Sequence, residues 1–423
     1  MILTEYQQAL FDGEYGDVLA KVTRTLVQYG EVFGSPYMVS VSGNSGHIVT
    51  SFGSKAMKPV SRIMDELIKN GIRSKQPFSV GPRPTDSAIP ASLMQRIGRS
   101  YTYSRQKKHE NQLKKLGYIN EDAFSCTCYM DEVGNVPNKG DVLSWAESSA
   151  VIYANSVLGA RCNLNSALVE LFGSIVGFVP YFGLLTDEGR KATWIVEVKT
   201  NEMPEAQLLG TAISSRVGGE VPYITGLDNW IGTLLTQGSC DFLKDMGGAA
   251  VVEGSMGLYH VDNLTPEAIE FGHELISKDA KKYVVDDAEL ARIRAEQNNG
   301  KTVKSEPSMC FIGCPHLSLT QLVEWTHKLS YSLKDAQKTK LGVMTVFTAA
   351  PGVIRAFNQT PESGRLNNMG GIVSYVCPVM YMCNPFCSKM PIITNSRKLT
   401  VCSSALYYTD DEIAEIITRR AKP

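Results

Sequence analysis

The sequence predicts an α/β protein made of several packed lobes with mostly parallel sheets. From residue 308 onward, short apolar runs alternate with helix-length segments, which is typical of a parallel sheet covered by helices. The chain has 423 residues, more than one simple hydrophobic core usually organises. The most charged stretch, residues 273–306, includes the turn sequence NNG at 298–300 and is predicted to connect lobes. A carboxyl-terminal α/β lobe is therefore expected at residues 307–423.

The elements before this connection are predicted mainly as helices. Residues 3–33 carry apolar side chains at helical spacing, and residues 38–41 fit a strand that is followed by the polar, Gly-rich SGNSGH. Residues 59–70 fit another helix. Residues 100–118 are rich in Lys, Gln and Tyr, which favours a solvated helix with His109 at the surface.

The carboxyl-terminal lobe is predicted to alternate strands and helices. The strands are SMCFIG, GVMTVFT, GIVSYVC and PIIT, with helices at 318–333 and up to residue 358. In a parallel sheet the reactive crevice lies outside the carboxyl ends of the strands. Cys314, Cys377 and the pair Asn395–Ser396 each end a strand, so we expect these side chains at one edge of the sheet.

The composition excludes several classes of partner. Lys and Arg number 42 against 43 Asp and Glu, so no basic field exists to hold a nucleic acid backbone. The acidic amino terminus lacks the order of a secretory signal, and no segment offers the ~18 apolar residues of a membrane span. We therefore expect a soluble, cytoplasmic protein. Its ten cysteines are then expected as free thiols, either buried or bound to a metal.

The cysteine spacing argues against the common paired metal motifs. Neither the C-x-C at 126–128 nor CNPFC at 383–387 has the C-x-x-C spacing of a zinc ribbon or a ferredoxin. A metal site would have to be assembled from distant single cysteines, whose three thiolates would leave one position of an iron centre open to substrate oxygen. The alternative is that each thiol is an inert buried side chain.

Several motifs occur in order along nearly the whole chain. They are WAESSAVIYANSVLGAR, VPYFGLLTDEGRKAT, GLYHVDNLTPEA, GCPHLSL, VCPV and ITNSRK. Together they resemble the large catalytic subunit of the aconitase X family. The resemblance implies that residues 1–423 form a catalytic region similar to the first three domains of aconitase. It also implies a separate small swivel-domain subunit, absent from this chain, that completes the active site.

The resemblance further implies a hydro-lyase with an iron or iron–sulfur centre on Cys126, Cys314 and Cys377. Known activities of the family are dehydration of cis-3-hydroxy-L-proline in bacteria and of mevalonate 5-phosphate in archaea. We expect the first to be the more similar, with the second or another hydroxy acid as alternatives. Iron would act as a Lewis acid on the leaving hydroxyl, while a protein base removes the proton next to a carboxylate. The cluster type, including a mononuclear iron, stays open.

Position in the family motifs suggests roles for four residues near this centre. Ser45 and His47, in the loop after the first strand, are expected to contact substrate or to form hydrogen bonds near iron; the alternative is a loop cap. Glu147 is expected to bind a substrate nitrogen or to orient a ligand, unless it only favours the helix dipole. His316 is expected to orient the metal-site loop, with a core histidine as the alternative.

The remaining expected site residues concern the substrate carboxylate and the opposite wall. Arg161 and Asn163 are expected to fix the carboxylate, because a guanidinium binds it bidentately and a lysine would not replace it. Asn395, Ser396 and Lys398 are expected to line the crevice on the other side.

The sequence also departs from the family pattern. Residues 162–166 read CNLNS where the family has TNREG, 126–129 read CTCY in place of CTPY, and 375–376 read YV in place of DT. The three expected ligands stay, but the surroundings that should select the substrate change. Further thiols that are candidates for ligation are Cys128, Cys162, Cys383 and Cys387.

Two other interpretations stay open. Thiolates also bind zinc, so the same fold could hold a zinc or a mononuclear iron centre. The loss of the family's second arginine and its acid is also consistent with a non-catalytic protein that binds a small acid or a partner.

Overall fold

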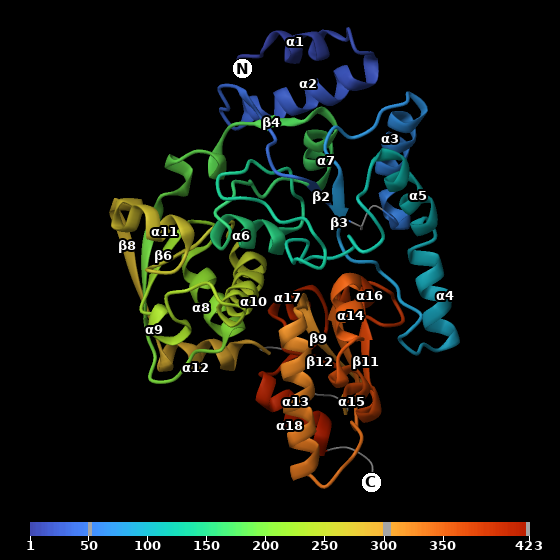
Figure 1. The fold of residues 1–423 in the computed structure, drawn as a ribbon, viewed down its shortest axis with the longest axis vertical. Coiled ribbons are helices and arrows are strands. Elements are labelled where there is room, and N and C mark those ends of the chain that lie inside the picture. Colours follow the sequence, from blue (N-terminus) through green and yellow to red (C-terminus); the bar gives the residue numbers. More distant parts are fainter. Residues whose placement is uncertain (50–52, 299–305, 420–423) are drawn as a thin grey trace.

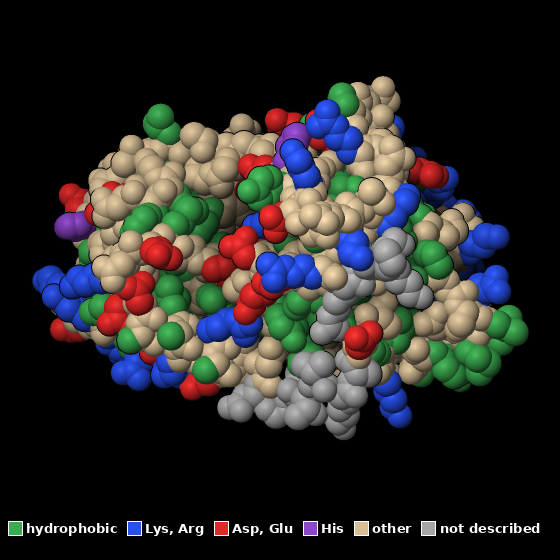
Figure 2. All heavy atoms as spheres, turned by 90° about the horizontal axis from the view of Figure 1, so that it is seen from below, with side chains coloured by type: hydrophobic (Ala, Val, Ile, Leu, Met, Phe, Trp, Pro, Cys, Tyr) green, Lys and Arg blue, Asp and Glu red, His purple; other side chains and the backbone are tan. Residues whose placement is uncertain are grey.

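The computed structural model describes residues 1–49, 53–298 and 306–419. Figure 1 shows the amino-terminal helices at one end and the carboxyl-terminal sheet with its helices at the other. A second sheet and its helices lie to the left, and the helices of residues 58–116 lie to the right. No helix in the described ranges combines the length and the apolar character needed to span a bilayer. Acidic and basic side chains are interspersed over the face shown in Figure 2.

The amino-terminal part is built from helices around two small strand pairs. The helices are α1 (Glu5–Asp12), α2 (Asp17–Val32), α3 (Lys58–Lys69), α4 (Leu93–Thr102), α5 (Gln106–Leu116) and α7 (Ala167–Val176). Strand β1 (Met38–Ser40) pairs antiparallel with β4 (Phe178–Pro180), and β2 (Gly46–Ile48) pairs parallel with β3 (Phe78–Val80). The expected helix over 3–33 is divided in two because Gly13, with φ of 97°, adopts the left-handed conformation that ends α1, and Gly16, also with φ of 97°, precedes α2.

The expectation for residues 100–118 needs a correction. The segment contains the end of α4 and the whole of α5 rather than one helix, and His109 is only 1% exposed. His109 lies on the inner face of α5 with Gln112, Leu113 and Leu116. Burial lowers the pKa of His109 to about 4, so the ring is neutral at pH 7. The lysines of this helix lie on its outer face, and they made the whole segment look solvated.

The second sheet is wholly parallel, in the order β7-β6-β5-β8. Its strands are β5 (Ala192–Lys199), β6 (Pro222–Thr225), β7 (His260–Val261) and β8 (Ile276–Asp286), and the helices of this part are α6 (Ser148–Ser156), α8 (Ala206–Val217), α10 (Gln237–Gly254) and α12 (Asp287–Glu296). The stretch 273–306 was predicted to be a connection. That was wrong for most of it, because 276–296 forms the edge strand β8 and the helix α12; residues 299–305 lie outside the described residues.

The carboxyl-terminal sheet is parallel throughout, in the order β11-β10-β9-β12-β13. Its strands are β9 (Met309–Leu317), β10 (Met344–Ala349), β11 (Gly371–Ser374), β12 (Ile392–Thr394) and β13 (Leu406–Tyr407), and its helices are α13 (Leu319–Asp335), α14 (Pro351–Phe357), α15 (Pro361–Met369), α16 (Pro378–Met382), α17 (Arg397–Cys402) and α18 (Asp410–Arg419). Every residue of β9 is buried, as expected for a central strand covered on both faces. The predicted alternation of strands and helices is confirmed here.

Helix starts bring polar residues to the carboxyl edge of this sheet. Ser318 begins α13 with a capping box: its hydroxyl accepts from the Gln321 N–H, and the Gln321 side chain accepts from the Ser318 N–H. Cys377 caps α16 just after β11, and Ser396 caps α17 just after β12. This edge meets the amino-terminal part through a parallel bridge between Arg83 and Val376. The junction between the two parts is where the candidate site lies.

Candidate active site

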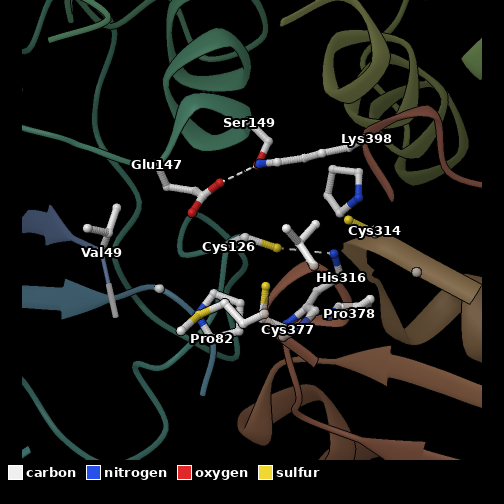
Figure 3. A pocket seen from close by; sticks show the side chains of 15 residues that line it. Val49, Pro82, Cys126, Glu147, Ser149, Cys314, His316, Cys377, Pro378 and Lys398 are labelled. Atoms are coloured by element: carbon white, nitrogen blue, oxygen red, sulfur yellow. Dashed lines mark hydrogen bonds and ion pairs between the residues drawn. The ribbon is translucent and has the colours of Figure 1, made fainter. Parts of the chain in front are cut away.

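A cavity of about 170 Å³, here called the thiol cavity, lies at this junction. Figure 3 shows the sulfur atoms of Cys126, Cys314 and Cys377 around one space. The three thiols come from the segment after β3, the end of β9 and the start of α16. Glu147 and Lys398 line the same cavity. Residues that are nearly two hundred positions apart in the chain therefore face one another.

Burial makes all three thiols hard to ionise. It raises the pKa of Cys126 to about 12 and that of Cys314 to about 11, and the pKa of Cys377 lies well above its ordinary value. Each of the three is also raised by at least one neighbouring thiolate of the set or by Glu147. A positive charge among them would reverse this effect, which is the environment in which thiols become metal ligands.

The three sulfur ligands are therefore of the chemical type that a soft metal centre binds. Thiolate sulfur is the ligand that iron–sulfur clusters and zinc prefer. In the described part of the chain, however, no group of three or more His, Cys, Asp or Glu side chains is already arranged to hold a metal ion. The thiols share a cavity without being drawn together.

His316 connects the three cysteine segments. Its backbone N–H donates to the Cys126 sulfur at 3.3 Å, and its Nε2 lies 3.2 Å from the Val376 carbonyl, next to Cys377. Since a carbonyl only accepts, Nε2 carries the proton, and Nδ1 accepts from the Ser125 hydroxyl at 3.1 Å. Burial lowers the pKa of His316 to about 4, so the ring is neutral. Both ring nitrogens are occupied, which favours the proposed orienting role over metal ligation.

Glu147 and Lys398 form an ion pair across the cavity, with the Lys398 Nζ 2.6 Å from Oε1 (Figure 3). Glu147 caps α6 and also accepts from the Ser149 hydroxyl at 3.4 Å. Burial alone would raise the pKa of Glu147, but the charge and hydrogen bond of Lys398 outweigh it and the pKa is lowered. The pKa of Lys398 is raised: burial opposes its charge, and Glu147 more than offsets this. Both groups are charged at neutral pH.

Two other expected site residues lie behind the cavity wall. The Ser45 carbonyl accepts from the indole N–H of Trp145 at 2.8 Å. His47 is fully buried on β2, with Nδ1 2.7 Å from the Ser79 hydroxyl. Its Nε2 has no hydrogen-bond partner among the described residues. Strand β2 leads directly to Val49, which does line the cavity.

Arg161 and Asn163 do not line the thiol cavity, and their expected role at the substrate carboxylate stays a prediction. Arg161 lines a second cavity of about 200 Å³, here called the arginine cavity, with Asp187, Arg190 and Glu267. Its guanidinium pairs with Asp187 at 2.5 Å and donates to the Leu185 carbonyl at 2.9 Å. The Asn163 amide bonds the Phe182 carbonyl and the Leu184 N–H. These side chains hold the loop after β4 in place.

The three expected residues after β12 differ in what their side chains contact. Ser396 donates to the Cys314 carbonyl at 2.5 Å and so fixes the backbone of that thiol. Asn395 donates to Asp410 at 2.8 Å, and it does not line the cavity. Lys398 alone of this expected group reaches the cavity with its side chain.

Comparison with known proteins decides the family. Residues 1–188 match the aconitase X first domain, and residues 192–295 match the aconitase X second domain. The phosphomevalonate dehydratase large subunit of Thermococcus kodakarensis is 31% identical over 326 residues, which are 77% of this chain and 76% of that protein. The chain belongs to the aconitase X family.

Further relatives agree on the reaction class of this aconitase X chain. The phosphomevalonate dehydratase large subunit of Methanocaldococcus jannaschii is 29% identical over 331 residues, covering 76% of this chain and 77% of that protein. The cis-3-hydroxy-L-proline dehydratase of Pseudomonas aeruginosa is 26% identical over 278 residues, covering 63% and 43%. The holo-form crystal structure of Thermococcus kodakaraensis aconitase X superposes with a TM-score of 0.81 at 26% identity, over 99% of this chain and 100% of that one. The aconitase X chain is a hydro-lyase, as these named dehydratases are.

The other candidate thiols of this aconitase X chain do not reach the thiol cavity. Cys128, Cys162 and Cys387 are fully buried, and Cys383 is exposed. The Cys162 thiol lies 3.7 Å from the Trp145 carbonyl and 3.4 Å from the Asn163 carbonyl, so it is engaged in its own core.

Sequence reasoning missed two serines of the aconitase X site. Ser149 lines the thiol cavity and bonds Glu147. Ser125 fixes the His316 ring from the residue before Cys126. The sequence indicates these serines only by their position, one or two residues from Cys126 and Glu147. Serines are equally common at helix starts and in turns, so this position alone does not predict a functional role.

Proposed function

We propose that this chain removes water from a small hydroxy acid, with Cys126, Cys314 and Cys377 holding an iron or iron–sulfur centre. One observation carries the proposal: three thiols from distant segments line the same cavity as a charged Glu147–Lys398 pair. When bound, such a centre supplies a Lewis acid toward the leaving hydroxyl. The surrounding residues then have to bind, orient and deprotonate the substrate.

Lys398 and Glu147 divide these tasks. One N–H of the Lys398 ammonium donates to Glu147, which leaves two donors for a substrate carboxylate, and the charge of Lys398 keeps Glu147 ionised. An ionised carboxylate beside the bound carboxylate group is placed to accept the neighbouring proton as a general base. Ser149 holds the Glu147 side chain in this orientation. His316 and Ser396 keep the cysteine segments in place without touching substrate.

The cavity favours cis-3-hydroxy-L-proline as substrate. Among the described residues that line it, Lys398 is the only Lys or Arg, and Glu147 already offsets its charge. A phosphate would need more positive charge or more donors than this lining provides. The ring nitrogen of hydroxyproline, by contrast, is a cation that Glu147 attracts.

Mevalonate 5-phosphate is the second candidate. The phosphomevalonate dehydratase large subunits align over 76% of this chain, and the cis-3-hydroxy-L-proline dehydratase of Pseudomonas aeruginosa over 63%. The same names support a separate small subunit as the partner, which would supply the missing phosphate contacts if this second substrate is the right one.

The experiment is anaerobic purification together with a candidate small subunit, followed by iron, zinc and sulfide analysis and by dehydration assays on both acids. We expect bound iron and turnover of one acid. If the purified complex contains zinc and no iron, the proposal of an iron centre is wrong and a zinc centre takes its place. Loaded iron with no turnover of these acids or of a wider hydroxy-acid panel would favour a non-catalytic binding protein.

A further inference from the structure

Helix α4 turns an apolar face to solvent. Its exposed apolar side chains, here called the α4 stripe, are those of Leu93, Met94, Ile97 and Tyr101. At 3.6 residues per turn these positions share one side of the helix, and each residue is 51–65% exposed. Figure 2 shows hydrophobic side chains gathered at the right-hand edge, the side on which Figure 1 places α4. A surface helix normally packs such a face against the core, so α4 is oriented the opposite way.

The polar face of α4 fixes this orientation. A Cβ at Gly98 would clash with Oδ1 of Asn384, so the helix lies directly against the loop after α16. The Asn384 amide donates to the Gln95 carbonyl at 2.9 Å. The guanidinium of Arg99, which is 9% exposed, lies over the Tyr381 ring at 5.7 Å. Rolling the helix to bury its stripe would break all of these contacts, so the stripe is exposed because of how the fold holds α4.

The same helix reaches the wall of the thiol cavity. Tyr103 is the C-cap of α4 and is 7% exposed, and its hydroxyl donates to the Met380 carbonyl at 2.6 Å. Met380 lines the thiol cavity, and the helix that carries it, α16, begins after Cys377. A protein seated on the α4 stripe would therefore lie beside the segment that presents one of the three thiols.

The border of the α4 stripe is basic. Residues 87–109 contain five Lys and Arg and no Asp or Glu. Arg96 is exposed on α4, and the Lys55 Nζ lies 3.6 Å from the centre of the Tyr101 ring. An apolar centre with a basic border is complementary to an apolar patch that is bordered by Asp and Glu.

A second copy of this chain fits the α4 stripe less well than a different protein does. A two-fold dimer places the same surface patch of both copies face to face. The basic borders of two α4 stripes would then lie against each other, and like charges across an interface oppose binding. The proposed function already includes a partner of another kind, the separate small subunit that the names of the relatives support.

We propose that the α4 stripe is the docking surface for this small subunit, which meets it with an apolar patch bordered by Asp and Glu. The inference rests on the proposed function for the existence of the subunit, and it adds the place and the chemistry of the contact. Docking buries the four apolar side chains of the stripe and pairs Arg96 with an acidic residue of the partner. It also seats the small subunit beside Met380, next to the thiol cavity.

Binding to the small subunit tests the α4 stripe without any turnover. Anaerobic isothermal titration calorimetry gives the Kd between the full chain and the purified small subunit that is co-expressed for the dehydration assays. Ile97→Glu should raise the Kd at least about 30-fold, because it places a charge in the buried centre of the contact and repels an acidic border. Arg96→Glu should raise the Kd by about tenfold and weaken its dependence on salt.

Two controls separate a lost contact from lost folding. Ile97 and Arg96 are both exposed, so the melting temperature of each variant should match that of the parent. Tyr331→Glu changes a residue of α13 that is 76% exposed and lies outside the stripe, and it should leave the Kd unchanged.

The outcomes distinguish this inference from the proposed function. If Ile97→Glu and Arg96→Glu bind the small subunit as tightly as the parent does, the docking surface is overturned and the partner is kept. If the unaltered chain forms no complex, the partner and the docking surface are overturned together. Self-association of the unaltered chain, or binding to phosphatidylglycerol vesicles, that Ile97→Glu abolishes would assign the stripe to a second copy or to a membrane surface, and either result would overturn the proposal.

Discussion

The thiol cavity and the arginine cavity both contain buried ionisable groups, but they differ in how many of those groups are held in ion pairs. In the arginine cavity, Arg190 is 1% exposed. Its Nε and Nη2 donate to the carboxylate oxygens of Glu267 at 2.7–3.0 Å. Its remaining N–H groups bond Asn155 and the Leu184 carbonyl. In the thiol cavity, Glu147 pairs with Lys398, whereas burial raises the pKa of Cys314 and of Cys377 and so keeps both thiols neutral.

The difference teaches how to tell a structural charge cluster from a reactive one. A buried arginine whose guanidinium N–H groups all have protein acceptors has no donor free for a ligand. Such an arginine stabilises the loops that it connects. Thiols whose pKa is raised by burial stay protonated, and they can lose the proton and bind when a metal cation enters the cavity. The motif resemblance selected residues from both cavities, and only their partners separate them.

The largest expected effect comes from removing one thiol. Cys314→Ser should lower bound iron and reduce turnover by on the order of 10³-fold or more, because a hydroxyl is a poor soft ligand and a Lewis acid contributes several kcal/mol. Iron content and kcat are measured together on the anaerobically purified complex. Cys402→Ser, at an exposed thiol outside the cavity, is the matched control. Unchanged iron in the Cys314 variant would remove this thiol from the ligand set.

The ion pair across the thiol cavity should show the next largest effect. Lys398→Met leaves Glu147 buried without its cation, which should destabilise the protein by roughly 3–5 kcal/mol and abolish turnover. Adding Glu147→Gln should restore most of the thermal stability, because no unpaired charge stays, while turnover stays absent. Melting temperature and kcat are followed for both single variants and the double variant. Activity recovered in the double variant would show that the pair is only structural.

Much of the thiol cavity was predictable because regular strands impose a rule. The alternation of apolar runs and helices predicted a parallel sheet. In such a sheet Cys314, Cys377 and the residues after β12 lie at one edge. Lys398 follows from the same rule. Cys126 and Glu147 lie in turn-rich chain, where no period places a side chain, and only the family motifs selected them.

Other features were beyond sequence reasoning for physical reasons. Edge strand β8 carries charged side chains that stay in solvent, so its alternation is hidden, and it was taken for a connection. His109 precedes the buried Leu113 and Leu116 by four and seven residues, so the helical period places it inward, and only its polar side chain predicted a surface position. Arg161 sits after a helix in irregular chain, whose direction depends on long-range contacts such as that with Asp187.

A third carboxylate, in neither cavity, sharpens the comparison. Glu170 is 1% exposed and accepts hydrogen bonds from Ser144 and Asn165, and it forms no ion pair with any residue that the structure describes. Burial raises its pKa to about 8. The folded state therefore keeps a proton that the unfolded chain has lost, so the stability present below about pH 4.5 declines as pH rises toward 8.

Glu170→Gln should flatten this decline, with a gain in the free energy of unfolding on the order of a few kcal/mol near pH 8 and little change near pH 4. Denaturant unfolding across this range measures it, with the exposed Glu188→Gln as the control. A variant whose stability falls with pH as steeply as the parent's would show that Glu170 ionises normally.

The smallest effect is expected in the arginine cavity, at Arg161→Lys. The partner carboxylate of Arg161, on Asp187, is 86% exposed, and such an ion pair contributes about 0–1 kcal/mol because water competes for both charges. A lysine keeps that charge and loses only the donation to the Leu185 carbonyl. We therefore expect the KM for the hydroxy acid to stay within about twofold of the parent's, since Arg161 lies outside the thiol cavity, where we propose that Lys398 binds the carboxylate. A roughly tenfold higher KM at an unchanged melting temperature would instead place Arg161 in contact with substrate, and it would make the arginine cavity part of the active site rather than its structural counterpart.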